Sequence, residues 1–266
     1  MISRLNIQAA VKADRTYLKN VFFTTPFKIA NITENRKARQ LKLMLMSSSP
    51  GILDGDQYQI KIDLDTGSSV QLLTQSYQRL FNMKESATQS MEVNMAAGSS
   101  FFYLPHPAVP HKQSSFSATN KIYLATRCSL ILGEILTCGR KLNGEVFLFS
   151  KYHSITEIYL ENKLVVKENL LIQPALTNVN AIGQLEGFTH QASLIYLDEQ
   201  ALDVELSKSL QGFLGGQNNI MFGITKAPVK GLIIRLLGQK AEQLYDCLVK
   251  MGEMINTGKT IQTNLV

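Results

Sequence analysis

Alternation of apolar and polar residues predicts strands along most of this chain. The clearest run covers residues 57–64, where every second side chain from Tyr58 to Leu64 is apolar, the pattern of a half-buried strand. A similar alternation covers residues 41–46. Further apolar segments recur from Phe22 to about Leu197, spaced by about ten residues, which is typical of a sandwich, barrel or solenoid. They include residues 70–72, 101–104, 122–124 and 146–149.

The C-terminal part adds two predicted helices to this strand pattern. Residues 158–160 and 164–166 predict a hairpin with a three-residue loop. A helix is then expected from an N-cap at Asp198 to Phe213, and a second from Lys240 to Ile255, with a strand at residues 233–237 between them. Since no linker divides the chain, we expect residues 1–266 to form a single domain.

A compact turn at residues 49–56, Ser-Pro-Gly-Ile-Leu-Asp-Gly-Asp, joins the two clearest strands. Pro50 fixes one backbone angle, and the two glycines permit positive φ values. The turn also carries two carboxylates, Asp54 and Asp56. The pattern leaves open whether they form the turn or bind a ligand.

Composition narrows the class of protein. With 45% hydrophobic and 18% charged residues, the 266-residue chain can bury a sizeable core. The net charge of +6 is spread along the chain, without the basic cluster expected of a nucleic-acid site. Three distant cysteines indicate free thiols and neither a disulfide framework nor a zinc site. We see no signal peptide and no apolar run long enough for a membrane span, so we expect a soluble cytoplasmic protein.

One segment resembles an enzyme motif. Asp65-Thr66-Gly67 matches the active-site loop of aspartic proteases, in which two facing carboxylates share a proton. The chain has no second such loop, and Asp and Gly between strands are ordinary turn residues. A small β-rich hydrolase is therefore kept as the alternative function. No GxSxG, GxGxxG or P-loop motif is present, so an NTP-driven step would belong to a partner.

Candidate metal ligands lie in two further segments. His106 and His111 share a proline-rich segment and could approach a common ion, although their spacing matches no standard ligand pattern. Glu134 and Glu145 are embedded in apolar sequence, where a carboxylate is costly unless it is paired. A nearby cation such as Arg140 would neutralise one of them; otherwise they could line a polar channel or a transient cation site.

Five motifs occur in a characteristic order along nearly the whole chain. They are residues 20–28, the turn at 49–56, Leu73-Thr74-Gln75-Ser76, the proline-rich residues 104–110, and Gly139-Arg140 with Gly144-Glu145-Val146-Phe147. In this order they resemble the UreD family of urease accessory proteins, called UreH in some bacteria. The stretch after Leu73 is closer to the UreH branch, and His111 stands where many members carry phenylalanine.

This resemblance implies a non-catalytic scaffold in urease maturation. Such proteins bind the urease apoprotein and UreF, and through UreF they recruit the GTPase UreG, which carries nickel. The family fold is a right-handed β-helix-like stack of sheets with helices toward the C-terminus. Nickel would pass through an internal polar tunnel, with no permanently bound cofactor; neither nucleic acid nor membrane is expected as a partner.

The tunnel hypothesis singles out acidic residues as a nickel path. We expect Asp56, Glu134, Glu145 and Glu168 to line it, with His106 as a further candidate. Carboxylates and water hold such an ion less tightly than thiolates do, which suits a path that must release it. Within the turn at 49–56, Asp54 is then the turn former and Asp56 the lining residue.

Overall fold

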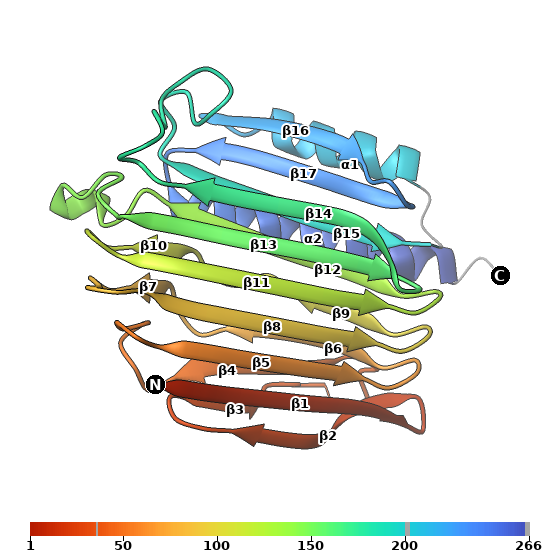
Figure 1. Ribbon diagram of the computed structural model, residues 1–266. Helices are drawn as coiled ribbons and strands as arrows, with labels where there is room; N and C mark the ends of the chain where they lie inside the picture. Colours follow the sequence, from red (N-terminus) through yellow and green to blue (C-terminus); the bar gives the residue numbers. More distant parts are fainter. Residues whose placement is uncertain (36, 200–202, 264–266) are drawn as a thin grey trace.

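The computed structural model describes residues 1–35, 37–199 and 203–263, in which two large sheets face each other (Figure 1). Sheet A consists, in spatial order, of β14 (Lys163–Ile172), β13 (Lys151–Leu160), β11 (Ser115–Leu124), β8 (Ala87–Met95), β5 (Gln57–Leu64), β1 (Ile2–Lys12) and β2 (Arg15–Phe23). Sheet B consists of β16 (Ile220–Lys226), β17 (Gly231–Gly238), β15 (His190–Asp198), β12 (Ser129–Thr137), β9 (Ser100–Tyr103), β6 (Ser69–Thr74), β4 (Leu41–Ser47) and β3 (Phe27–Asn31), with β7 (Gln78–Leu80) and β10 (Ala108–Pro110) to one side.

Apart from the short strands β7 and β10 of sheet B, the chain passes alternately between the sheets from β4 to β13. The strands β5, β8, β11 and β13 pair in parallel within sheet A, and β4, β6, β9 and β12 pair in parallel within sheet B. Consecutive long strands therefore do not pair with each other, which is the connectivity of a coil and not of a hairpin sandwich. The expectation of a mainly β fold with two C-terminal helices is confirmed, whereas the right-handed β-helix stays a prediction, as does the single domain.

The turn at residues 49–56 connects a strand of sheet B to a strand of sheet A, and it stacks on the next turn of the coil. The Ile52 amide donates to the Arg79 carbonyl at 2.8 Å, and β7 pairs in parallel with β10 one layer further on. A Cβ on Gly51 would lie 2.3 Å from the Arg79 carbonyl oxygen, so only glycine fits where these turns stack.

Two hydrophobic cores hold these layers together. One lies between the sheets; the other lies between sheet B and the helices α1 (Asp203–Gly215) and α2 (Ala241–Thr263). In α2, Leu244, Leu248, Met251 and Ile255 are buried at helical spacing, as its amphipathic pattern predicts. Both helices lie behind sheet B in Figure 1, so in the described part of the chain no helix covers the outer face of sheet A.

Several local predictions are corrected by the structure. Residues 146–149 form no strand: Phe147 has a φ of +54°, which a strand does not tolerate, and the segment belongs to a loop after the short 3₁₀ helix η1 (Lys141–Asn143). Asp198 ends β15 instead of capping a helix; α1 is described from Asp203, and residues 200–202 lie outside the described residues.

The predicted hairpin is present with a shorter loop. Strands β13 and β14 are joined by Glu161 and Asn162 alone, with φ values of +47° and +66°. Two consecutive positive φ values are the geometry of the tight turn that suits twisted antiparallel strands. The strand expected at residues 233–237 forms the middle of β17.

Candidate functional site

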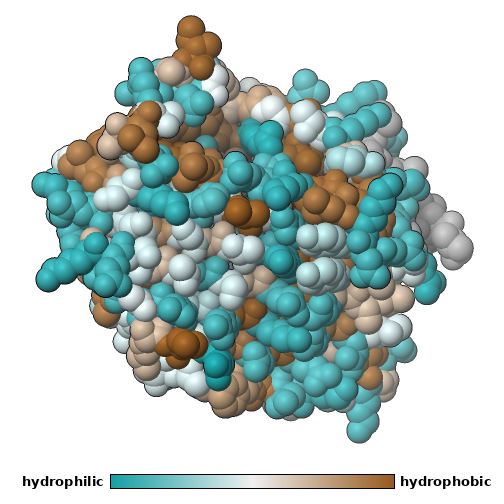
Figure 2. All heavy atoms as spheres, in the orientation of Figure 1, coloured by the Kyte–Doolittle hydropathy of each residue, from teal (hydrophilic) through white to brown (hydrophobic). Residues whose placement is uncertain are grey.

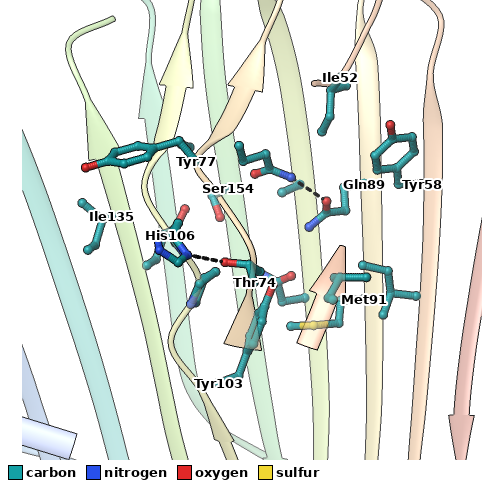
Figure 3. A pocket seen from close by; sticks show the side chains of 18 of the residues that line it. Ile52, Tyr58, Thr74, Tyr77, Gln89, Met91, Tyr103, His106, Ile135 and Ser154 are labelled. Atoms are coloured by element: carbon teal, nitrogen blue, oxygen red, sulfur yellow. Dashed lines mark hydrogen bonds between the residues drawn. The ribbon is translucent and has the colours of Figure 1, made fainter. Parts of the chain in front are cut away.

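A cavity of about 160 Å³, lined by both polar and apolar side chains, lies between the sheets (Figure 3). Strands of both sheets contribute to its wall, together with the turn at 49–56 and the segments around Ser76 and His106. Its polar lining from the strands includes Gln89, Asn120, Glu134, Tyr152, Ser154, Thr156, Glu168 and Ser193. Polar side chains at inward positions interrupt what is otherwise the apolar core, so this region differs from the rest of the interior.

Sheet A supplies a row of neighbouring polar groups to the cavity. Asn120, Thr156 and Glu168 are paired in register across β11, β13 and β14. The Asn120 Nδ2 donates to the Thr156 Oγ1 at 3.0 Å. In Figure 3, Gln89 is joined by a hydrogen bond of 2.9 Å to Gln78, whose Nε2 donates. The row places amide and hydroxyl groups next to a carboxylate inside the fold.

Sheet B faces this row with Glu134 on β12. Its Oε1 accepts a hydrogen bond from the Tyr152 hydroxyl at 2.7 Å. Burial raises the pKa of Glu134, hydrogen bonds from Tyr152 and Ser154 oppose that rise, and the charge of Glu168 adds to it. The Glu134 carboxyl therefore holds its proton more strongly than it would in water.

An ion pair joins the two sheets at Glu168, which lines the cavity. The Arg235 Nη2 on β17 donates to both carboxylate oxygens of Glu168 on β14, at 2.7 Å and 2.6 Å. The side chain of Glu168 is 25% exposed and that of Arg235 is 62% exposed, so the carboxylate faces inward and the guanidinium faces solvent.

His106 lies at the end of the cavity formed by the turns. Its Nδ1 is 2.9 Å from the Thr74 Oγ1, as Figure 3 shows, and its ring stacks on Tyr245 of α2 at a centroid distance of 4.4 Å. Burial lowers the pKa of His106, so the ring is neutral at neutral pH. The lining residues Gln75 and Ser76 are exposed, so this end of the cavity reaches the surface.

Two of the predicted nickel ligands, Asp56 and Glu145, lie outside the cavity. Asp56 accepts a hydrogen bond from the Leu53 amide at 2.9 Å, which closes the turn. Glu145 forms an ion pair with Arg140, whose Nε donates at 2.9 Å, and the two-point contact lowers the pKa of Glu145 to about 2. Both carboxylates therefore have structural partners, and the neutralising pair considered from the sequence is the one found at Glu145.

The remaining candidates have separate surroundings. The carboxylate of Asp54 accepts the Lys84 and Glu85 amides at 3.1 Å and 3.0 Å, so it fixes the neighbouring turn. The ring of His111 packs against Phe81 at 4.7 Å and does not line the cavity with His106.

The protease-like loop is a surface turn between β5 and β6. The Lys19 Nζ donates to the Asp65 carboxylate at 3.0 Å, and the Ser68 hydroxyl donates to the Asp65 carbonyl at 2.7 Å. Gly67 has a φ of +72°, as a turn requires. This loop is explained by turn formation.

Among the described residues, the structure thus brings Glu134, Glu168 and His106 to one cavity. Sequence reasoning missed the neutral members Gln89, Asn120, Ser154 and Thr156, for which the signal was a polar residue at an inward position of an alternating strand. No group of three or more His, Cys, Asp or Glu side chains in this part of the chain is arranged to hold a metal ion. The cavity offers scattered oxygen ligands, which suit weak contact with a hard or borderline cation.

Comparison with known proteins gives a consistent result over almost the entire chain. The family model described as UreD urease accessory protein matches residues 2–263. A protein of Flavobacterium johnsoniae named urease accessory protein UreD is 51% identical over 252 residues, covering 94% of this chain and 91% of the relative. Proteins of the same name from Acetivibrio thermocellus and Haemophilus influenzae are 37% and 33% identical, covering 92% and 97% of this chain and 94% and 100% of their own lengths. None of the helices in the described residues has the length and apolar character needed to cross a membrane.

Proposed function

The chain belongs to the UreD family of urease accessory proteins, and we propose that it acts in urease maturation as a scaffold through which nickel passes to the apoenzyme. The family is one of accessory proteins and not of catalysts. Its proposed place of action is the cytoplasm.

The scaffold role would require surfaces for the urease apoprotein and for UreF, through which the GTPase UreG is recruited. Exposed apolar side chains support such surfaces: Leu142 of η1 and Leu176 and Ile182 of the loop before β15 are all largely exposed. Figure 2 shows brown, hydrophobic atoms protruding at the end of the molecule where Figure 1 places η1 and this loop. Contiguous apolar patches left in solvent, unlike single exposed side chains, mark protein interfaces.

Co-purification tests the scaffold role. Tagged protein from cells that express the urease operon should retain UreF and the urease apoprotein under mild conditions. A Leu142→Ser, Ile182→Ser double variant should retain less of at least one of them, because the apolar contact area is lost. Purification of the folded chain without any of these proteins would contradict the scaffold.

The nickel path rests on one observation above all, the position of Glu134. Its carboxyl faces a cavity of neutral polar groups and has a second carboxylate, that of Glu168, as an electrostatic neighbour. A conduit must bind its ion well enough to admit it and loosely enough to release it. Single carboxylates supported by hydroxyl and amide oxygens meet that requirement, because they give few ligands at any one point.

Urease activation in cells tests the path. Glu134→Gln and Glu168→Gln should each lower the nickel content and activity of urease while leaving UreF bound. Glu157→Gln is the matched control, since this carboxylate lies on the outward side of β13 and pairs with Lys167 at 2.9 Å. Normal activation by both cavity variants would refute the path and leave the scaffold role intact.

A further inference from the structure

The ion pair between Glu168 and Arg235 joins the two sheets beside the cavity, which Glu168 lines. Glu168 belongs to the edge strand of sheet A, and Arg235 to a strand of sheet B that lies beside it in Figure 1. Glu134, Ser193 and Arg235 are paired in register across sheet B. Glu134 and Ser193 line the cavity, and Arg235 is the next residue of the same row, outside the lining.

We infer that Arg235 competes with the passing ion for the Glu168 carboxylate. Arg235 binds this carboxylate while the passage is empty, and a divalent cation displaces it. This inference rests on the proposed nickel path. The guanidinium takes both carboxylate oxygens of Glu168, which are also the two atoms that a passing cation would use. A cation cannot contact this carboxylate fully until Arg235 leaves it.

Displacement of Arg235 is physically easy because of its exposure. Its side chain is 62% exposed, so the released guanidinium is hydrated at once and leaves no unpaired charge in the interior. A pair this open contributes little to the stability of the fold. Its main consequence is local: it keeps the inner carboxylate neutralised and satisfied between ions.

The same competition selects for charge. A monovalent cation at Glu168 gains no more Coulomb energy than the guanidinium it would replace, whereas a divalent cation gains about twice as much at equal distance. Arg235 thereby acts as a specificity-determining residue, because Na⁺ and K⁺, although abundant, do not displace it. A divalent ion binds with only the difference between its own Coulomb energy at Glu168 and that of the guanidinium.

Nickel binding to the purified full-length chain tests this inference. With nickel chloride as the titrant in isothermal titration calorimetry, Arg235→Gln should bind about two- to fivefold more tightly than the wild type, the size expected when an exposed competing ion pair is lost. The Glu168→Gln, Arg235→Gln double variant should lose the gain. Arg140→Gln is the matched control, because it opens another arginine–glutamate pair, that with Glu145, outside the cavity.

Three results would overturn the inference. They are that Arg235→Gln binds nickel no more tightly than the wild type, that Arg140→Gln gains as much nickel affinity as Arg235→Gln, or that the double variant keeps the gain in nickel affinity. If thermal melting shows that Arg235→Gln does not fold, Arg235→Lys decides, because lysine does not hold both carboxylate oxygens in the arginine fork: tighter nickel binding than in the wild type supports the inference, and equal binding overturns it. Urease activation by Glu134→Gln tests the nickel path separately. A failure of the nickel path can therefore be distinguished from a failure of the competition by Arg235.

Discussion

Helix α2 is held against sheet B by a close approach at Gly252, and enlarging this residue should disturb the packing between the helix and the sheet. A Cβ at this position would lie 2.6 Å from Cζ and 2.7 Å from Cε2 of Phe102. Phe102 is only 6% exposed and belongs to the core between sheet B and the helices, so its ring has no free space to move into. The helix must therefore shift outward to accommodate a methyl group.

Two opposing effects set the magnitude for Gly252→Ala. Replacing glycine by alanine within a helix gains about 1 kcal/mol from backbone entropy. Overpacking a buried contact costs about 1–3 kcal/mol. The net change in the free energy of unfolding is expected to lie between no change and a loss of about 2 kcal/mol.

Gly212 in α1 provides the matched control. A Cβ there would meet nothing within 4 Å, so Gly212→Ala should show the helix gain alone, an increase of about 1 kcal/mol. Urea unfolding followed by circular dichroism measures both variants against the wild type. The reasoning is refuted if Gly252→Ala stabilises the protein as much as Gly212→Ala does, because the contact with Phe102 would then cost nothing.

Other predictions concern single polar groups. The raised pKa of Glu134 means that its ionised form opposes folding, so the free energy of unfolding should fall as pH rises above 4.5, and Glu134→Gln should lose this component in urea titrations at several pH values. Glu145, with a pKa lowered to about 2 chiefly by Arg140, stabilises the fold above pH 4.5 and loses that contribution as pH falls toward 2; Arg140→Ala should abolish this component in acid unfolding. Ser114→Ala should be neutral or stabilising by thermal melting, because the buried Ser114 hydroxyl has no hydrogen-bond partner among the described residues. Ser3→Ala should instead cost about 1 kcal/mol in the same melts, because the buried Ser3 hydroxyl donates to a backbone carbonyl at 2.9 Å.

Several strand positions were predictable, whereas strand partners were not. The alternation at residues 41–46 and 57–64 identified β4 and β5 and the buried face of β5. It carried no information on pairing, and the structure places these consecutive strands in different sheets. Period-two alternation indicates which side of a strand is buried. Strands joined as in a solenoid show the same alternation as strands joined by a hairpin. The UreD resemblance, and not the pattern, pointed to stacked sheets.

Two strand errors have specific causes. The strand β1 was not predicted because its inward residues begin with a polar one, Ser3, while Ile2 faces outward. The run at residues 146–149 was predicted as a strand on apolar content alone. There Phe149 is buried while Leu148 is exposed, but the backbone is bent at Phe147. Residue type in a short segment does not determine the backbone angles that tertiary contacts impose.

The carboxylates that line the cavity are those with an inward position in a strand, and for these the sequence prediction placed the side chain correctly. Glu134 and Glu168 lie inside strands β12 and β14, and register carries both to the cavity. Asp56 and Glu145 lie in turns, where nearby amides and Arg140 satisfy them locally. A carboxylate in a turn can fold back on its own backbone, but one in the middle of a strand cannot.

The row of polar residues in the cavity and the turn at residues 49–56 both follow from the way in which the chain passes between the two sheets. Each turn of the coil adds one strand to each sheet, so an inward polar residue on one strand is placed beside the inward residue of the next, as Asn120 is beside Thr156. A row of such residues is therefore continuous without any motif in the sequence. The turns are fixed by the stacking of Ile52 on Arg79 and by Asp54 and Asp56, which hold backbone amides. Asp54 and Asp56 in the turn at 49–56 would therefore help to fix the register of the strands, on which the row of polar residues depends. The carboxylates within the strands, those of Glu134 and Glu168, would contact the ion.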